Sequence, residues 1–187
     1  MNTYVVLIRG INVGGKNKIP MKELKRYLEE QGFENVVTYI QSGNVILKSD
    51  LDAKTVGSQI ETLLVEKFTL DSPAINVLVL TRAQFQAVVE NKPDGFGEEP
   101  DTYHSDAIFL MGVESAQAMP VFDPREGVDQ VWPGEGVIYS QRLSAQRTKS
   151  RLNKIMASPL YKSMTIRNWN TTTKLLDMLQ EIDAASE

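Results

Sequence analysis

The residues best suited to chemistry in this chain form a glycine-rich loop at positions 9–18. The loop contains three cations and three glycines: Arg9, Lys16, Lys18, Gly10, Gly14 and Gly15. Glycine adopts backbone conformations that turn successive N–H groups toward one point, and the cations add positive charge there. Asn12 adds a carboxamide to the same loop. The loop therefore predicts a binding site for an anionic group, and its alternative is a structural turn with solvated lysines.

A second polar group lies at 165–171, where a short apolar run meets the last amphipathic segment. Asn168 or Asn170 is placed to cap a terminal helix, and Arg167 stands directly before them. A helix N-terminus with an adjacent guanidinium attracts anions, because the free N–H groups and the helix dipole favour negative charge. The alternative is that Trp169 anchors the core and Arg167 is an ordinary surface residue.

A third polar group is the turn 41–44, which contains Ser42 and Asn44. If the first and third strands are neighbours in the sheet, Arg9 at the end of one lies close to Asn44 at the start of the other. We therefore expect one site, in a cleft between two halves of the chain. The predicted ligand-binding residues are Arg9, Asn12, Gly14, Gly15, Lys16, Ser42, Asn44, Arg167, Asn168 and Asn170.

The elements that would position these residues follow from the spacing of apolar side chains. Residues 1–81 alternate in the order strand, helix, strand, strand, helix, strand, which is the ferredoxin-like βαββαβ plan with an antiparallel sheet. The strands are expected at 4–8, 35–40, 44–48 and 75–80, and the helices at 21–31 and 52–68.

Residues 82–187 repeat this plan more loosely, after a connecting helix and a loop at 91–100. We expect strands at 105–111, 128–132, 136–140 and 164–167, with helices at 114–119, 145–157 and 170–183. The fold class is therefore α+β, with two ferredoxin-like halves, 1–81 and 82–187, and a C-terminal helix.

Composition excludes several kinds of chemistry. The 187 residues include no cysteine and one histidine, His104, so disulfides, thiolate catalysis and clusters of cysteine or histidine metal ligands are excluded. The run His104-Ser105-Asp106 has the residue types of a catalytic triad, but consecutive residues do not assemble that geometry. The apolar runs are too short to span a membrane and no secretion signal is visible, so a cytoplasmic location is expected.

Charge is unevenly distributed along the chain. Residues 1–22 carry four cations and residues 141–174 carry eight, and neither stretch contains an acid. Such segregation indicates a positive face. An RNA or polyanion surface, or a docking face for an acidic protein, is therefore an alternative to a small-molecule site, although the pI of about 5.2 argues against a dedicated nucleic-acid binder.

The chain resembles the bacterial family known as domain of unknown function 1697. The similarity rests on Leu7–Gly15, Pro20-Met21, Thr38-Tyr39, Gln41–Asn44 and Ile166–Thr171, and it covers nearly the whole chain. Thr165-Ile166 departs from the two threonines that are more common in the family. The resemblance implies an α+β architecture and that the three polar groups belong together. It implies no activity, substrate or cofactor.

The leading functional prediction is binding of a phosphate-bearing small molecule, with phosphoryl or phosphate-ester chemistry left open. Gly10 to Lys16 matches most of a Walker A pattern. However, Asn17 stands where that pattern needs a hydroxyl, and Pro20 starts the helix too late. The sequence identifies no cofactor and no oligomeric state, and it does not decide whether the chain is an enzyme.

Overall fold

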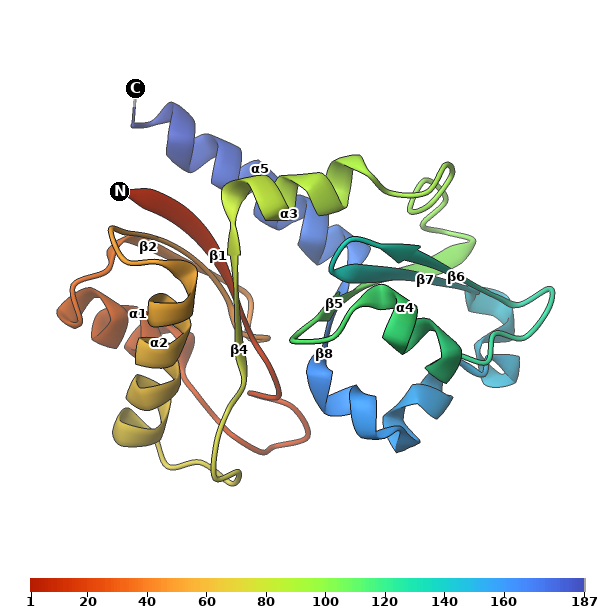
Figure 1. Cartoon of the computed structure of the whole chain (residues 1–187), viewed down its shortest axis with the longest axis horizontal. Coiled ribbons are helices and arrows are strands. Elements are labelled where there is room, and N and C mark those ends of the chain that lie inside the picture. Colours follow the sequence, from red (N-terminus) through yellow and green to blue (C-terminus); the bar gives the residue numbers. More distant parts are fainter. Residues whose placement is uncertain (187) are drawn as a thin grey trace. The chain divides into compact units, whose positions relative to one another are not determined.

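Residues 1–81 fold in the predicted order around a four-stranded antiparallel sheet (Figure 1). The structure, a computed structural model, describes residues 1–186. The strands are β1 (Asn2–Ile8), β2 (Glu34–Tyr39), β3 (Asn44–Ser49) and β4 (Val77–Thr81), in the spatial order β2-β3-β1-β4. The first and third strands are therefore the inner pair, as the ferredoxin-like prediction required.

Two helices cover one face of this sheet: α1 (Met21–Glu30) and α2 (Ala53–Lys67). Met21, Leu24 and Leu28 of α1 are buried at the predicted helical spacing. They form one continuous core with the apolar residues of α2 and with Tyr4, Val6 and Ile8, which alternate along β1. Asp52 caps α2, because its side chain accepts a hydrogen bond from the Thr55 N–H at 2.8 Å.

Side chains bond two of the backbone N–H groups on the outer edge of β4. The Arg9 N–H donates to the Asn76 carbonyl, so the backbone of Asn76 faces β1. In an antiparallel pair this direction alternates, so the backbone N–H and C=O groups of Val77 and Thr81 face away from β1. The Val77 N–H donates to Glu61 Oε1 at 3.1 Å, and the Thr81 N–H donates to Gln84 Oε1 at 2.9 Å. These side chains occupy donors that an added strand would otherwise use.

Residues 103–168 form the second ferredoxin-like sheet. Its strands are β5 (Tyr103–Leu110), β6 (Asp129–Gly134), β7 (Val137–Leu143) and β8 (Met164–Asn168), in the spatial order β6-β7-β5-β8. This order matches that of the first sheet, with β5 in the place of β1. The short helix α4 (Ser115–Ala118) and the 3₁₀ turn η1 (Met119–Val121) follow β5.

The predicted basic helix over 145–157 is wrong. The segment forms two 3₁₀ turns instead, η2 (Ser144–Lys149) and η3 (Leu152–Ala157), and a third turn, η4 (Pro159–Ser163), follows. Gln146 leaves helical geometry with φ −123°. Leu152 and Ile155 are the buried pair of η3, and a spacing of three matches a 3₁₀ turn as well as an α-helix.

Two further helices are α3 (Arg82–Glu90) and α5 (Trp169–Ala184). The described chain divides into two compact units: unit 1 comprises Met1–Gln86 and the chain from Leu175 onward, and unit 2 comprises Ala87–Lys174. This division falls five residues after the boundary expected from the sequence, and α5 has residues in both units. Within residues 1–186, no helix is long and apolar enough to cross a membrane.

Candidate functional site

The glycine-rich loop is a tight hairpin in unit 1. Val13 and Lys16 form an isolated antiparallel bridge, and the Lys16 N–H donates to the Val13 carbonyl at 3.0 Å. Gly14 and Gly15 between them have φ of +59° and +73°. Both central residues of this turn are left-handed, as in a type I′ turn, so other residue types would be strained there. The whole tip, from Val13 to Lys16, is exposed to solvent.

Asn12 holds one side of the hairpin and ties it to the β2–β3 turn. Its Nδ2 donates to the Ile19 carbonyl at 2.9 Å and to the Gln41 carbonyl at 2.7 Å. Its Oδ1 accepts from the Ile19 N–H at 2.7 Å. The carboxamide predicted to bind a ligand is therefore a structural connector with all of these bonds made inside the protein.

Asn17, which is not among the predicted site residues, holds the other side of the hairpin. Its side chain lies 6% exposed and accepts from the N–H groups of Asp71 and Ser72 at 2.9 and 3.1 Å. Its Nδ2 donates to the Gly10 carbonyl and to Ser72 Oγ. The Asn17 N–H donates to Asp71 Oδ2 at 2.6 Å. The loop after α2 is thus the second support of the hairpin.

The β2–β3 turn lies against the end of β1. Leu7 pairs with Asn44, and the Ile8 N–H donates to the Gly43 carbonyl at 2.9 Å. Gly43 has φ +85°, and a Cβ there would lie 2.9 Å from Ile8 Cβ. Asn44 is fully buried, and its Nδ2 donates to the Tyr39 carbonyl and to Ser42 Oγ. Asn44 therefore closes the turn in which it lies.

The cations of the hairpin differ in exposure. Arg9 is partly buried, and its backbone N–H donates to the Asn76 carbonyl at 3.0 Å. Lys16 and Lys18 are exposed, and neither forms an ion pair with another of the residues 1–186. The two lysines are consequently the available charges of this loop.

The second predicted group lies in unit 2, at the junction of β8 and α5. Arg167 is 8% exposed, and burial lowers its pKa to about 10. The Asn168 Oδ1 accepts from the Thr171 N–H at 2.7 Å, so Asn168, one of the two predicted candidates, caps the helix. Trp169 is buried edge-to-face against Phe96, with ring centroids 5.0 Å apart. Trp169 is therefore a core anchor, and Arg167 is a buried residue rather than a surface one.

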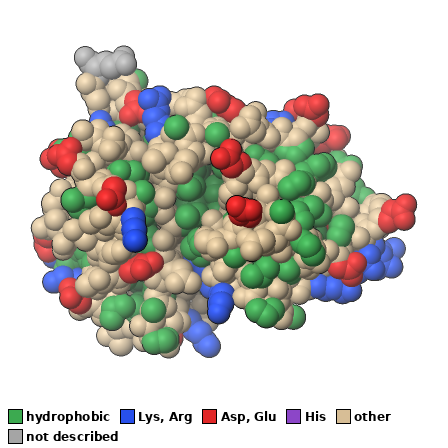
Figure 2. Space-filling view, in the orientation of Figure 1, with side chains coloured by type: hydrophobic (Ala, Val, Ile, Leu, Met, Phe, Trp, Pro, Cys, Tyr) green, Lys and Arg blue, Asp and Glu red, His purple; other side chains and the backbone are tan. Residues whose placement is uncertain are grey.

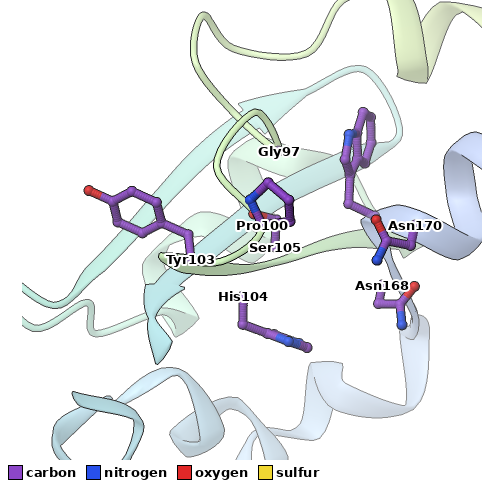
Figure 3. Close-up of a pocket in the computed structure, with 8 residues that line it drawn as sticks. Gly97, Pro100, Tyr103, His104, Ser105, Asn168 and Asn170 are labelled. Atoms are coloured by element: carbon purple, nitrogen blue, oxygen red, sulfur yellow. The ribbon is translucent and has the colours of Figure 1, made fainter. Parts of the chain in front are cut away.

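A pocket opens beside this junction. β5 extends three residues beyond its pairing with β8, which begins at Asp106. The pocket is small and open, with a volume of about 90 Å³, and its walls come from β5, the loop before it and the start of α5 (Figure 3). Its lining residues are Gly97, Pro100, Tyr103, His104, Ser105, Asn168, Trp169 and Asn170.

The histidine of this pocket is bonded to Asp106, which is not among the predicted site residues. His104 Nε2 lies 3.0 Å from Asp106 Oδ2, and the two side chains are 42% and 18% exposed. β5 begins at Tyr103, two residues before the predicted strand at 105–111, so His104 lies in the strand and points to the same face as Asp106. Ser105 lies on the opposite side of β5 (Figure 3) and donates to Gln141 Oε1 at 3.0 Å. The three residues form no triad, as expected.

The basic stretch 141–174 is partly neutralised within unit 2. Arg151 and Lys154 both bind Asp123, at 3.4 and 2.8 Å, and these contacts hold the pKa of the Asp123 carboxyl below its ordinary value. Figure 2 shows Lys and Arg side chains gathered near the 3₁₀ turns of unit 2, with acidic side chains among them. With Arg167 buried as well, fewer of the eight cations are available to a polyanion than the sequence suggested.

The predicted site residues thus fall into two groups, one in each unit. Arg9, Asn12, Gly14, Gly15, Lys16, Ser42 and Asn44 lie around the hairpin and the β2–β3 turn of unit 1, and Arg167, Asn168 and Asn170 lie in unit 2. That both groups line one cleft stays a prediction. Among residues 1–186, no three His, Asp or Glu side chains lie close enough together to hold a metal ion.

Comparison with known proteins identifies similar chains. A family model described as "Protein of unknown function (DUF1697)" matches residues 1–139. The structure of the conserved bacterial protein SP0830 from Streptococcus pneumoniae is similar with a TM-score of 0.79 at 29% identity, over 95% of this chain and 98% of that one. No curated protein matches the chain significantly.

Proposed function

The chain belongs to the DUF1697 family, and we propose that it is a binding protein whose hairpin, residues 12–19, holds the anionic group of a phosphate-bearing ligand. The observation that supports this proposal is the pair Lys16 and Lys18. Both lie on an exposed and internally braced hairpin, and neither is neutralised by an acid within residues 1–186.

The hairpin is ordered before any ligand arrives. The carboxamides of Asn12 and Asn17 bond the backbone on both sides of the turn. A loop that is already ordered loses little conformational entropy on binding, so more of the contact energy contributes to affinity. Only the lysine side chains need to be restrained.

The glycines allow a ligand to approach the backbone. At Gly14 and Gly15, no atom lies within 4 Å of the position that a Cβ would take. An oxyanion can therefore reach the turn from the solvent side while the lysines supply charge. The nearest acid bonded to the hairpin is Asp71, whose carboxylate accepts from the Asn17 N–H.

The shape of the hairpin limits what it can do. The tip is exposed to solvent, and Val13 there is 63% exposed. A ligand would therefore lie on the surface of the hairpin and would not be enclosed in a pocket. Contacts between exposed charges are screened by salt, and we expect affinity to fall as ionic strength rises. Residues 12–19 contain lysine as their one ionisable type, so the proposal is confined to binding and includes no phosphoryl chemistry.

The test is a titration followed by ¹H–¹⁵N spectra, in which the amides of Gly14 and Gly15 are direct reporters. Inorganic phosphate, a nucleoside triphosphate and a polyglutamate peptide are added separately at low and at 0.3 M salt. Saturable shifts with the phosphate compounds, weakened at least tenfold in Lys16→Ala/Lys18→Ala, support the proposal. Lys22→Ala is the matched control, because Lys22 is an exposed lysine of the same unit outside the hairpin.

Other outcomes would overturn the proposal. Shifts with the peptide alone would make the hairpin a protein-docking element, which is the alternative raised by the charge pattern. An equal response in the double variant, or no response from the wild type to any probe, would show that the lysines do not bind an anion.

A further inference from the structure

We infer that the pocket at the start of α5 is a second site, in which His104 acts as a general base in the hydrolysis of small, uncharged carboxylic esters. This site lies within unit 2 and is independent of the hairpin in unit 1. Four observations carry the inference: the histidine–carboxylate pair, the small pocket around it, the arginine opposite the histidine and the amide donors of the wall.

The carboxylate determines which imidazole nitrogen is the base. His104 Nε2 lies 3.0 Å from Asp106 Oδ2. A carboxylate accepts hydrogen bonds, so this contact places the proton of the neutral imidazole on Nε2 and leaves the lone pair on Nδ1. Asp106 is a positioning residue: β5 holds it opposite Asn168 of β8 and Ser140 of β7, in the middle of three paired strands.

The pocket brings amide donors to the same place as this base. Asn168 shares the sheet face of Asp106, and Figure 3 shows its carboxamide on the same side of β5 as His104. The helix cap uses Asn168 Oδ1, so its Nδ2 group is the part available to donate. Asn170 adds a second carboxamide, and the first turn of α5 adds its dipole. Such donors stabilise negative charge that develops on a carbonyl oxygen during a reaction.

Charges of both signs stand near His104. The loop before β5 carries exposed acids at Glu98, Glu99 and Asp101, and one of them, Glu98, binds Lys92 at 2.9 Å. On the sheet, His104 is bonded to Asp106 and pairs across to Arg142 of β7, so an anion and a cation stand beside it and favour a neutral ligand over a strongly charged one. The pocket volume of about 90 Å³ fits a small acyl group such as acetyl, with the rest of the ester outside the pocket.

The reaction balances with water as its second reactant. His104 Nδ1 takes a proton from water as the water oxygen bonds to the acyl carbon, and the carbonyl oxygen becomes the anion held by the amide donors. The bond from the acyl carbon to the alcohol oxygen then breaks, and that oxygen takes the proton from Nδ1. One ester and one water give one carboxylic acid and one alcohol. Ser105 is not the nucleophile, because its hydroxyl donates to Gln141 on the other side of β5.

The test is hydrolysis of p-nitrophenyl acetate, followed by release of p-nitrophenolate. His104 is the one histidine of the chain, so the change in rate from wild type to His104→Gln isolates the imidazole contribution. We expect the rate to saturate with substrate and kcat/KM to fall by about 100-fold in His104→Gln. Asp106→Asn should lower kcat more than it changes KM, and it should alter the dependence of kcat/KM on pH. Asn153→Ala is the control, because Asn153 is an exposed asparagine outside the pocket.

Two results would overturn the inference. One is a rate in His104→Gln equal to that of the wild type. The other is a rate that rises linearly with substrate and matches the same concentration of free imidazole, which would mean that the histidine reacts as an exposed side chain without a site. Circular dichroism of each variant verifies the fold, and the 42% exposure of the His104 side chain makes His104→Gln compatible with it.

Discussion

Replacing Asn17 by alanine should destabilise unit 1 more than its position in a surface loop suggests. The side chain is 6% exposed and makes four hydrogen bonds, two as acceptor from the N–H groups of Asp71 and Ser72 and two as donor to Gly10 and Ser72. Asn17→Ala removes all four and leaves two backbone N–H groups and a carbonyl to find new partners.

The magnitude follows from these bonds and from the backbone. Each net hydrogen bond contributes about 0.5–1.5 kcal/mol. Asn17 also has φ +48°, a left-handed conformation that asparagine tolerates and that costs alanine roughly 1 kcal/mol more. We therefore expect Asn17→Ala to lower the free energy of unfolding by about 3–5 kcal/mol.

The assay is urea unfolding followed by two signals. Both tryptophans, Trp132 and Trp169, lie in unit 2, so tryptophan fluorescence reports that unit, whereas far-ultraviolet circular dichroism reports both. The substitution should move the circular dichroism transition to lower urea concentration. Asn17→Gly separates the two contributions, because it removes the side chain without the left-handed penalty.

A loss below about 1 kcal/mol would refute this reasoning, because it would mean that water replaces the side-chain bonds at no net cost. Equal stability of the alanine and glycine variants would refute the backbone contribution alone. A much smaller effect of Asn12→Ala on unit 1 would show that the hairpin depends on its support from residues 71–72 and less on the β2–β3 turn.

Substitutions at three other positions test the packing, the sheet edge and the titration. Gly43→Ala should lower the free energy of unfolding by about 2–4 kcal/mol in urea. Alanine would have to adopt φ +85°, and its Cβ would lie 2.9 Å from the Ile8 Cβ. A loss under about 1 kcal/mol would contradict the close approach. Glu61→Ala should uncover the Val77 N–H on the edge of β4 and increase self-association in analytical ultracentrifugation, and Glu61→Gln should not; equal behaviour of both would contradict a role in edge protection. Burial raises the pKa of Tyr139 to about 12, so the native state binds the phenol proton more tightly than the unfolded chain does, and stability should fall as pH rises from about 10 toward 12. In Tyr139→Phe, the free energy of unfolding should fall less steeply with pH over this range. An unchanged slope would mean that other groups cause the fall.

Much of the architecture could be predicted because it depends on local patterns. Alternation of apolar residues locates most strands, and the turn residues 41–44 locate the first hairpin. The basic segment 145–157 could not be predicted in the same way. Its buried pair, Leu152 and Ile155, is spaced by three, which fits either an α-helix or a 3₁₀ turn.

The candidate site was less predictable, because the role of a polar side chain depends on its partners. Asn12 and Asn44 resemble ligand-binding residues in the sequence, yet their carboxamides bond carbonyls in the loops of unit 1. The pair His104 and Asp106 depends on where β5 begins, because alternate residues share a face only within a strand. The predicted strand begins at Ser105, whereas β5 begins at Tyr103 and includes His104.

The amino-acid sequence was sufficient for the α+β class, the inner pairing of β1 with β3 and the left-handed turn at Gly14 and Gly15, because spacing and residue type specify these locally. Only the tertiary structure decided that Asn17 is a support while Lys16 and Lys18 are available, and that His104 stands in a pocket. The physical reason is that a polar side chain is satisfied or available according to groups far away in the chain. For Asn17, those groups are 54 and 55 residues distant, and only folding brings them within hydrogen-bond reach.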